Sequence, residues 1–416
     1  MVNSHGRMKL FIDNTGLHAV GRCLEGEAKG EPDIAGLLQF ATQLVFSDEL
    51  FYSAFPGTGV ASRSHEVSEQ VSELGVSSDV LRLSPFDAVS YERTLLAAAE
   101  RLADELKFAF TRTPTKSVLI ATSSPDLNPL EQRHYDNLHR AIKSGTESSR
   151  SELLAEGAGM QLVGSGARLV TISDNLWIQA SRLAHNKSWK KADTAKLVVM
   201  MRCYLNQELA TLLSQSEGDN VDYSPSVARA RIIQAQDAYV LGKLSEIIGL
   251  AAQKLDSTKL EAPPIAKALA LKAKGDPKGI LAEALIAREK ATELRRYLRK
   301  VVDAARKETS ADSEALKKDA IIHRLRNAVK ELATLLEQDL GIAPPPSLRP
   351  ALEISMIGPV PIPPLRKMVE WAEHKWKRPR VTILSEFAKI LANPTTDKFA
   401  LQKLYSICQR KVKPAP

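Results

Sequence analysis

The first 185 residues alternate between two hydrophobic patterns. Short apolar runs rich in β-branched and aromatic residues predict strands, which we expect at 9–12, 49–55, 80–83, 117–122 and 168–172. Longer segments with apolar residues three and four positions apart predict helices, which we expect at 34–45, 65–74, 91–110 and 133–143. Because helices separate the strands, we expect an α/β domain over 1–185 with a sheet that is at least partly parallel.

Residues after 190 follow an almost wholly helical pattern. Over 193–214 the apolar residues fall on one helical face, at Leu197, Met200, Met201, Tyr204, Leu205, Leu209 and Leu212. Ser224-Pro225 and Asp276-Pro277 each combine an N-capping residue with a proline suited to the first helical position. These pairs predict helices over 224–255 and 276–307, and periodicity predicts another over 313–340.

A proline-rich stretch interrupts the helical pattern. Residues 343–364 contain eight of the 22 prolines, and proline blocks both helix and sheet hydrogen bonds, so we expect an extended connector. The predicted organisation of the 416 residues is an α/β domain, a basic helical domain, this connector and a C-terminal helical segment. Their expected bounds are 1–185, 186–342, 343–364 and 365–416.

Charge divides unevenly between the two halves of the chain. The net charge of +8 is the sum of −6 over residues 1–185 and +14 over the remainder. A basic domain attracts polyanions such as nucleic acids, although lysine-rich helices also occur simply as solvated faces. The imbalance therefore predicts nucleic-acid contact for the second half.

Cysteine usage and hydropathy bear on the compartment. Cys23, Cys203 and Cys408 are far apart and odd in number, so they predict buried thiols in a reducing compartment rather than a disulfide framework or a zinc site. No apolar run reaches the ~20 residues of a membrane helix, and the first eight residues lack the apolar core of a signal peptide. We expect a cytoplasmic protein without a membrane segment.

Two of the predicted strands lead into an Asp-Asn pair, Asp13-Asn14 and Asp174-Asn175. Neighbouring strands of an α/β sheet end at one edge, where ligands bind, so these aspartates can share a metal ion. The alternative is that both pairs form strand-end turns, in which Asp and Asn cap their own backbone.

Taken with Glu66, Glu69 and Glu152, these pairs make the chain over residues 8–185 resemble the PIN-like nuclease domain. That family has an acid after its first strand, a helical glutamate, an acid at the start of a late helix, and a final strand ending in Thr-x-Asp. The resemblance implies that the catalytic and metal-binding residues are Asp13, Glu66 or Glu69, Glu152 and Asp174, with Asp136 as a rival to Glu152.

The chain departs from that family in four places. Glu152 stands where the family usually has Asp, and residues 116–145 form an insertion. Asn14-Thr15 stands in swapped order, and Thr171-Ile172-Ser173-Asp174 has one extra residue. The resemblance implies Mg²⁺ or Mn²⁺, the hard cations that carboxylate oxygens bind, and a role in bacterial defence.

Two groups of basic residues are candidates for phosphate contact. Arg288, Arg295, Arg299 and Arg306 fall on one face of the predicted helix 276–307, and arginine binds phosphate bidentately. The alternative is a solvated or salt-bridged face. Nearer the end, basic residues accompany an aromatic that can stack on bases or belong to the core, at Lys375, Trp376, Lys377, Arg378 and Arg380.

These observations lead to two hypotheses. The first is a metal-dependent nuclease directed at RNA, in which the basic helical domain holds the substrate. The second is a non-catalytic helical protein that binds nucleic acid, a protein partner or a second copy of itself.

Overall fold

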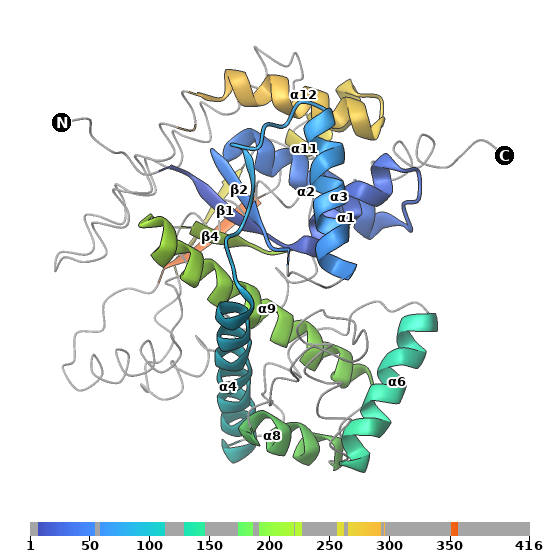
Figure 1. The fold of residues 1–416 in the computed structure, drawn as a ribbon, viewed down its shortest axis with the longest axis vertical. Coiled ribbons are helices and arrows are strands. Elements are labelled where there is room, and N and C mark those ends of the chain that lie inside the picture. Colours follow the sequence, from blue (N-terminus) through green and yellow to red (C-terminus); the bar gives the residue numbers. More distant parts are fainter. Residues whose placement is uncertain are drawn as a thin grey trace.

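The computed structural model describes residues 7–54, 59–112, 129–145, 174–185, 191–219, 221–226, 256–261, 265–292, 295 and 351–356 (Figure 1). Its centre is a sheet of four parallel strands in the order β3–β2–β1–β4. The strands are β1 (Lys9–Ile12), β2 (Glu49–Tyr52), β3 (Leu81–Leu83) and β4 (Val221–Ser224). The predicted parallel α/β sheet is thus confirmed, and its first three strands lie where they were expected.

The two central strands are apolar on both faces because helices cover both sides of the sheet. Side chains of a strand point alternately to opposite faces. Leu10 and Leu50 therefore belong to one core, while Phe11 and Phe51 belong to the other.

One face is covered by α1 (Asn14–Leu24), α2 (Glu31–Phe46), α3 (Gly59–Glu73), α11 (Ile265–Lys272) and α12 (Pro277–Lys290) (Figure 1). Helix α2 is central to this layer, since all of its residues from Asp33 to Phe46 are buried. A Cβ added to Gly36 would lie 2.6 Å from the Cβ of Ala19. The glycine therefore allows α1 and α2 to approach closely.

The other face is covered by α4 (Ala88–Arg112) and α9 (Lys191–Glu217), which pack with α6 (Pro129–Ser144) and α8 (Asp174–His185) (Figure 1). The apolar face predicted for α9 is confirmed, because Leu197, Met201 and Tyr204 are buried in this second core. None of the helices in the described part of the chain is both long and apolar enough to cross a membrane.

The predicted boundary at residue 185 does not separate two cores. Strand β4 lies beyond it and ends at Ser224, the residue at which the sequence predicted the start of a helix. Helices α11 and α12 share the core of α2 and β1. With only four residues, two of them polar, β4 has too little apolar sequence to predict a strand.

A second sheet lies in the later part of the chain. Strand β5 (Asp256–Glu261) pairs antiparallel with β6 (Ala351–Met356). Strand β6 falls within the predicted connector 343–364, so part of that segment is a paired strand rather than a plain extended linker. The predicted strands 117–122 and 168–172 lie outside the described residues.

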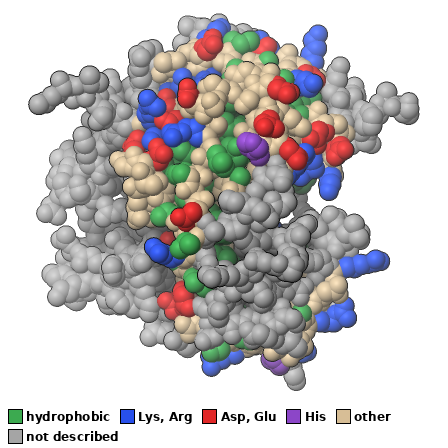
Figure 2. Space-filling view, in the orientation of Figure 1, with side chains coloured by type: hydrophobic (Ala, Val, Ile, Leu, Met, Phe, Trp, Pro, Cys, Tyr) green, Lys and Arg blue, Asp and Glu red, His purple; other side chains and the backbone are tan. Residues whose placement is uncertain are grey.

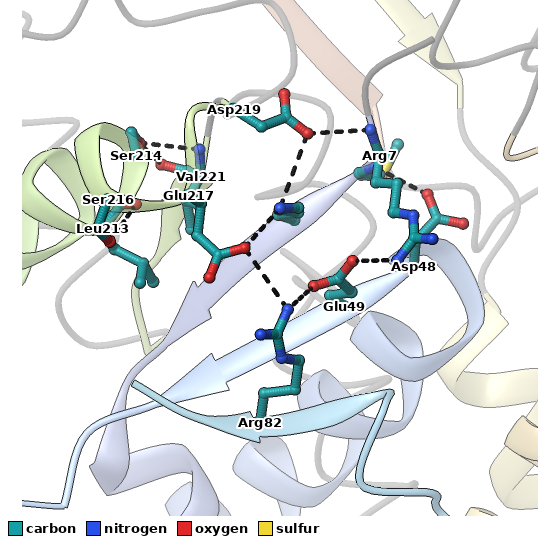
Figure 3. Close-up of polar contacts among 12 residues, drawn as sticks. Arg7, Asp48, Glu49, Arg82, Leu213, Ser214, Ser216, Glu217, Asp219 and Val221 are labelled. Carbon is teal, nitrogen blue, oxygen red and sulfur yellow. Dashed lines mark hydrogen bonds and ion pairs between the residues drawn. The ribbon is translucent and has the colours of Figure 1, made fainter. Parts of the chain in front are cut away.

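Charged side chains form a network at the amino edge of the four-stranded sheet (Figure 3). Glu49, at the start of β2, is 3% exposed and accepts hydrogen bonds from Arg7 at 2.8 Å and Arg82 at 2.5 Å. Lys9, at the start of β1, donates to Glu217 at 2.7 Å. Burial raises the pKa of Glu49, but the two arginines outweigh this effect, so its pKa lies below the usual value. The network joins three strands to the end of α9.

Candidate functional site

The order of the strands creates a crevice at the carboxyl edge of the sheet. From β1 the chain proceeds outward through β2 and β3, and it later returns to place β4 on the opposite side of β1. In open parallel sheets, ligands bind at the carboxyl ends of strands where the order reverses in this way. The residues that follow β1 and β4 are therefore the first candidates for a functional site.

Asp13 follows β1 and is 3% exposed. It is the N-cap of α1, with Oδ1 accepting a hydrogen bond from the Thr15 amide at 3.0 Å. Its Oδ2 lies 3.3 Å from the Tyr223 hydroxyl and 3.5 Å from the Ser226 amide, both from β4 or the residues just after it. The carboxylate therefore joins the ends of the two central strands.

Helix α2 supplies two amide side chains to the same edge. Gln39 Nε2 donates to the Pro225 carbonyl oxygen at 2.6 Å, and Gln43 Nε2 donates to Ser224 Oγ at 2.8 Å. They are one helical turn apart and face β4 together. The end of β4 is thus held between Asp13 on one side and α2 on the other.

A small cavity lies between these elements, with Asp13, Gln39, Gln43, Ser224 and Ser226 on its wall. Its volume of about 10 Å³ has room for one water-sized group. The Gln39 Oε1 atom is buried without a hydrogen-bond partner. The residues around the cavity therefore include one carboxylate, two serines and two glutamines, beside the apolar Ile12, Leu17 and Phe40.

Two other polar groups at this edge also have unsatisfied atoms. Asn14 donates through Nδ2 to the Ser53 carbonyl oxygen at 2.6 Å, but its Oδ1 is buried without a partner. Ser84, just after β3, is 4% exposed and its hydroxyl is likewise unpartnered. Unsatisfied buried polar atoms are uncommon in folded proteins. Of the nine such side-chain atoms in the described residues, three belong to Asn14, Gln39 and Ser84 at this edge.

The predicted glutamates on α3 do not join Asp13. The Glu66 side chain is 57% exposed and lies 3.4 Å from Arg63. The Glu69 side chain is 66% exposed and lies 3.5 Å from His65. Both have partners on their own exposed helix face, so the structure does not bring them into the cavity.

Asp174 also lies apart from Asp13. It is the first residue of α8, which belongs to the helical layer well away from the sheet in Figure 1. Asp136, the rival third acid, is on α6, where it accepts a hydrogen bond from Gln132 at 2.9 Å. Glu152 lies outside the described residues. Within the part of the chain that the structure describes, no three acidic, histidine or cysteine side chains form a metal-binding group.

Arg288 and Arg295 have a structural role rather than forming an exposed phosphate-binding face. Arg295 is 6% exposed. Their guanidinium groups donate to carbonyl oxygens at the end of α2, those of Leu44, Ser47 and Asp48 for Arg288 and that of Val45 for Arg295. Burial and the nearby Arg295 lower the pKa of Arg288 to about 10. These arginines therefore cap α2 and anchor α12.

The remaining predicted nucleic-acid contacts lie outside the described residues, at Arg299, Arg306, Lys375, Trp376, Lys377, Arg378 and Arg380. On the face shown in Figure 2, the described acidic and basic side chains are interspersed. The described part of this face therefore does not carry a large surface of one charge.

The sequence interpretation missed Gln39, Gln43, Ser224, Ser226 and Tyr223. The sequence did contain a signal for the glutamines, because they are polar residues in a helix that is apolar on nearly every side. Such helices are buried, and a polar side chain within one must find a partner or a ligand. The residues of β4 gave no comparable signal.

Comparisons of the chain with protein families, curated proteins and solved structures found no match. The resemblance to PIN-like nucleases therefore stays a prediction that rests on the residues quoted above. Function has to be inferred from the carboxyl edge itself.

Proposed function

We propose that this protein is a metal-dependent nuclease that acts on RNA, with its centre around Asp13 at the carboxyl edge of the sheet. The observation that carries the proposal is a buried carboxylate beside a small cavity that polar and apolar residues line together, at the position where the strand order reverses. The net charge of +14 beyond residue 185 supports a polyanionic substrate.

The donor atoms fit Mg²⁺ or Mn²⁺. These cations prefer oxygen ligands, and Mg²⁺ is commonly held by one or two carboxylates while it keeps several waters. Asp13 would supply the charged ligand, and Gln39 and Ser224 lie on the same cavity wall with neutral oxygens. A divalent cation supplies phosphoryl polarisation and a more acidic water.

The chain's own residues orient the carboxylate for this role. The Thr15 amide and the Tyr223 hydroxyl hold different oxygens of Asp13, so its side chain is fixed before any ligand binds. Preorganisation of this kind lowers the cost of ordering a site on binding. The close packing of α1 and α2 keeps the cavity narrow, which limits it to a small ligand.

The test compares two aspartates with the same local structure. Asp13 and Asp276 are both N-caps in extended backbone conformation, and each accepts a hydrogen bond from a nearby backbone amide. Asparagine caps helices about as well as aspartate. We expect Asp13→Asn to abolish Mn²⁺-dependent cleavage of labelled single-stranded RNA, and Asp276→Asn to retain it.

Two results would contradict the proposal. Cleavage by Asp13→Asn at the wild-type rate would exclude this aspartate from the centre. Salt-sensitive RNA binding by the wild-type chain without Mn²⁺-dependent cleavage would instead favour the non-catalytic nucleic-acid-binding protein. A parallel assay on single-stranded DNA of the same sequence tests the preference for RNA.

A further inference from the structure

Gln39 presents a buried acceptor that the fold leaves unused. The residue is 4% exposed, and its amide orientation is decided by the Pro225 carbonyl oxygen, which can only accept a hydrogen bond. Nε2 must therefore face Pro225, and this leaves Oε1 buried without a partner. An unpartnered buried amide oxygen destabilises a fold, so a ligand that satisfies it would recover stability.

The geometry points to a direct role for Gln39. We propose that Gln39 Oε1 is the neutral oxygen ligand of a divalent cation that is also held by Asp13, which lines the same cavity. This inference rests on the cation site of the proposed function and adds a ligand from α2. The cation would then be shared by the end of β1 and a helix that is fully buried from Asp33 onward.

Three properties of the cavity favour a hard cation as its occupant. The cavity admits about one water-sized group, which excludes a nucleobase or a sugar from its interior. Its lining includes five oxygen-bearing side chains, beside apolar ones such as Ile12, Leu17 and Phe40; the five are those of Asp13, Gln39, Gln43, Ser224 and Ser226. Asp13 is the one carboxylate on that wall, so electrostatics favour a cation there over an anion.

Gln43 offers a matched control for the structural part of Gln39's role. Both glutamines lie on α2, both donate through Nε2 to the end of β4, and both are at least nine-tenths buried. The unpartnered amide oxygen belongs to Gln39, whereas no such atom is found for Gln43. If the amides only held β4, replacing either one by methionine would have the same effect.

Cation binding can be measured without any catalytic assay. Tb³⁺ is a suitable luminescent substitute for a hard divalent cation, and the Tyr223 ring can sensitise its emission because the Tyr223 hydroxyl lies 3.3 Å from Asp13 Oδ2. Sensitised emission that disappears in Tyr223→Phe would assign the bound ion to this edge. Mn²⁺ added in competition then reports the affinity for the divalent cation in each variant of the full chain.

Two substitutions of Gln39 should change the affinity for Mn²⁺ in opposite directions. Gln39→Glu adds a second negative ligand and loses the hydrogen bond to the Pro225 carbonyl oxygen. We expect the added charge to outweigh that loss and Mn²⁺ to bind about tenfold more tightly, since affinity for hard cations rises with ligand charge. Gln39→Met removes the oxygen, and we expect binding about tenfold weaker. Gln43→Met keeps that oxygen and removes only the hydrogen bond to Ser224, so its loss of affinity should be smaller. The gain in Gln39→Glu cannot come from misfolding, and thermal unfolding checks the folding of the methionine variants.

Several outcomes would overturn the assignment. These are wild-type affinity in Gln39→Met, weaker or unchanged binding in Gln39→Glu, and equal losses in Gln39→Met and Gln43→Met. Tb³⁺ or Mn²⁺ binding that survives in Asp13→Asn would also overturn it. If the cation binds as expected but RNA is not cleaved, the ligand assignment holds and the nuclease proposal fails, so the two failures are distinguishable.

Discussion

The two edges of the four-stranded sheet differ in how their polar groups are satisfied. At the amino edge, Lys9, Glu49 and Arg82 are joined in a network of opposite charges (Figure 3). At the carboxyl edge, Asp13 lies beside uncharged amides and hydroxyls, and three buried oxygens there have no partner, those of Asn14, Gln39 and Ser84. The amino edge therefore carries more charged side chains than the carboxyl edge, and its polar groups are more completely paired.

This difference separates stability from binding. Paired charges at the start of parallel strands hold those strands in register. Unpartnered acceptors at the carboxyl ends weaken the fold by themselves but can be satisfied by a bound cation. A substitution at the amino edge should thus alter stability, and one at the carboxyl edge should also alter cation binding.

Reversing the charge of Glu49 should have the largest effect. Glu49→Lys would place a further positive charge among Arg7, Lys9 and Arg82, in a site that is 3% exposed. An uncompensated buried charge costs about 3–5 kcal/mol, and we expect urea unfolding to show a loss of that size. Glu66→Lys on the exposed face of α3 is the control, with an expected change below about 1 kcal/mol. Equal losses in the two variants would show that the charge network at Glu49 does not stabilise the fold more than an exposed ion pair does.

The next largest effect concerns the packing that shapes the carboxyl edge. Gly36→Ala would bring a Cβ to 2.6 Å from Ala19, so α2 must shift and carry Gln39 with it. We expect a loss of about 2 kcal/mol in urea unfolding and weaker Tb³⁺ binding. Gly16→Ala has nothing within 4 Å of its new Cβ and should be neutral or slightly stabilising. Unchanged stability in Gly36→Ala would disprove the close contact.

The amino edge should also respond to pH. The folded-state pKa of Glu49 is lowered because the hydrogen bonds from Arg7 and Arg82 outweigh the effect of burial. Its contribution is therefore present above the unfolded pKa of about 4.3 and is lost as pH falls through the lower folded pKa. We expect Glu49→Gln to be about 1.5 kcal/mol less stable than wild type at pH 7, and this difference should shrink below about pH 4. A difference that stays constant from pH 7 to pH 3 would contradict the ionic explanation.

The smallest expected effect is that of Tyr223→Phe. The Tyr223 hydroxyl contacts Asp13 and Asn206 at 3.3 Å each, while its ring packs near Phe11. The ring is retained, so we expect a loss of about 1 kcal/mol for the hydrogen bonds alone, measured by urea unfolding. A much larger loss would mean that Tyr223 positions β4, rather than only fixing the carboxylate.

Local patterns in the sequence predicted several elements correctly. Strand β1 and the start of α12 at Asp276-Pro277 depend on short-range signals, namely an apolar β-favouring run and an N-cap followed by proline. The same kind of signal identified Asp13 as a strand-end acid. Helix α1 was not predicted, because Asp13-Asn14 is as suited to a turn as to the N-cap of a helix.

Long-range placement was not readable from these patterns. Asp174 begins α8 instead of meeting Asp13, and Arg295 turns inward to cap α2 although its spacing also fits an exposed face. Helical periodicity shows which residues share a face, but it does not show whether that face meets solvent or another helix end. The partner of Gln39 was equally unreadable from the sequence, since it is the carbonyl oxygen of Pro225, 186 residues away.

The sequence by itself determined the parallel α/β character of the first three strands and the position of one acid at the end of β1, because these features depend on neighbouring residues. The tertiary structure alone decided that β4 lies beside β1, that the glutamines of α2 reach it, and that the predicted acids remain apart. Those outcomes depend on which distant segments bury apolar surface together, and the free energy of that burial is a property of the whole packed molecule.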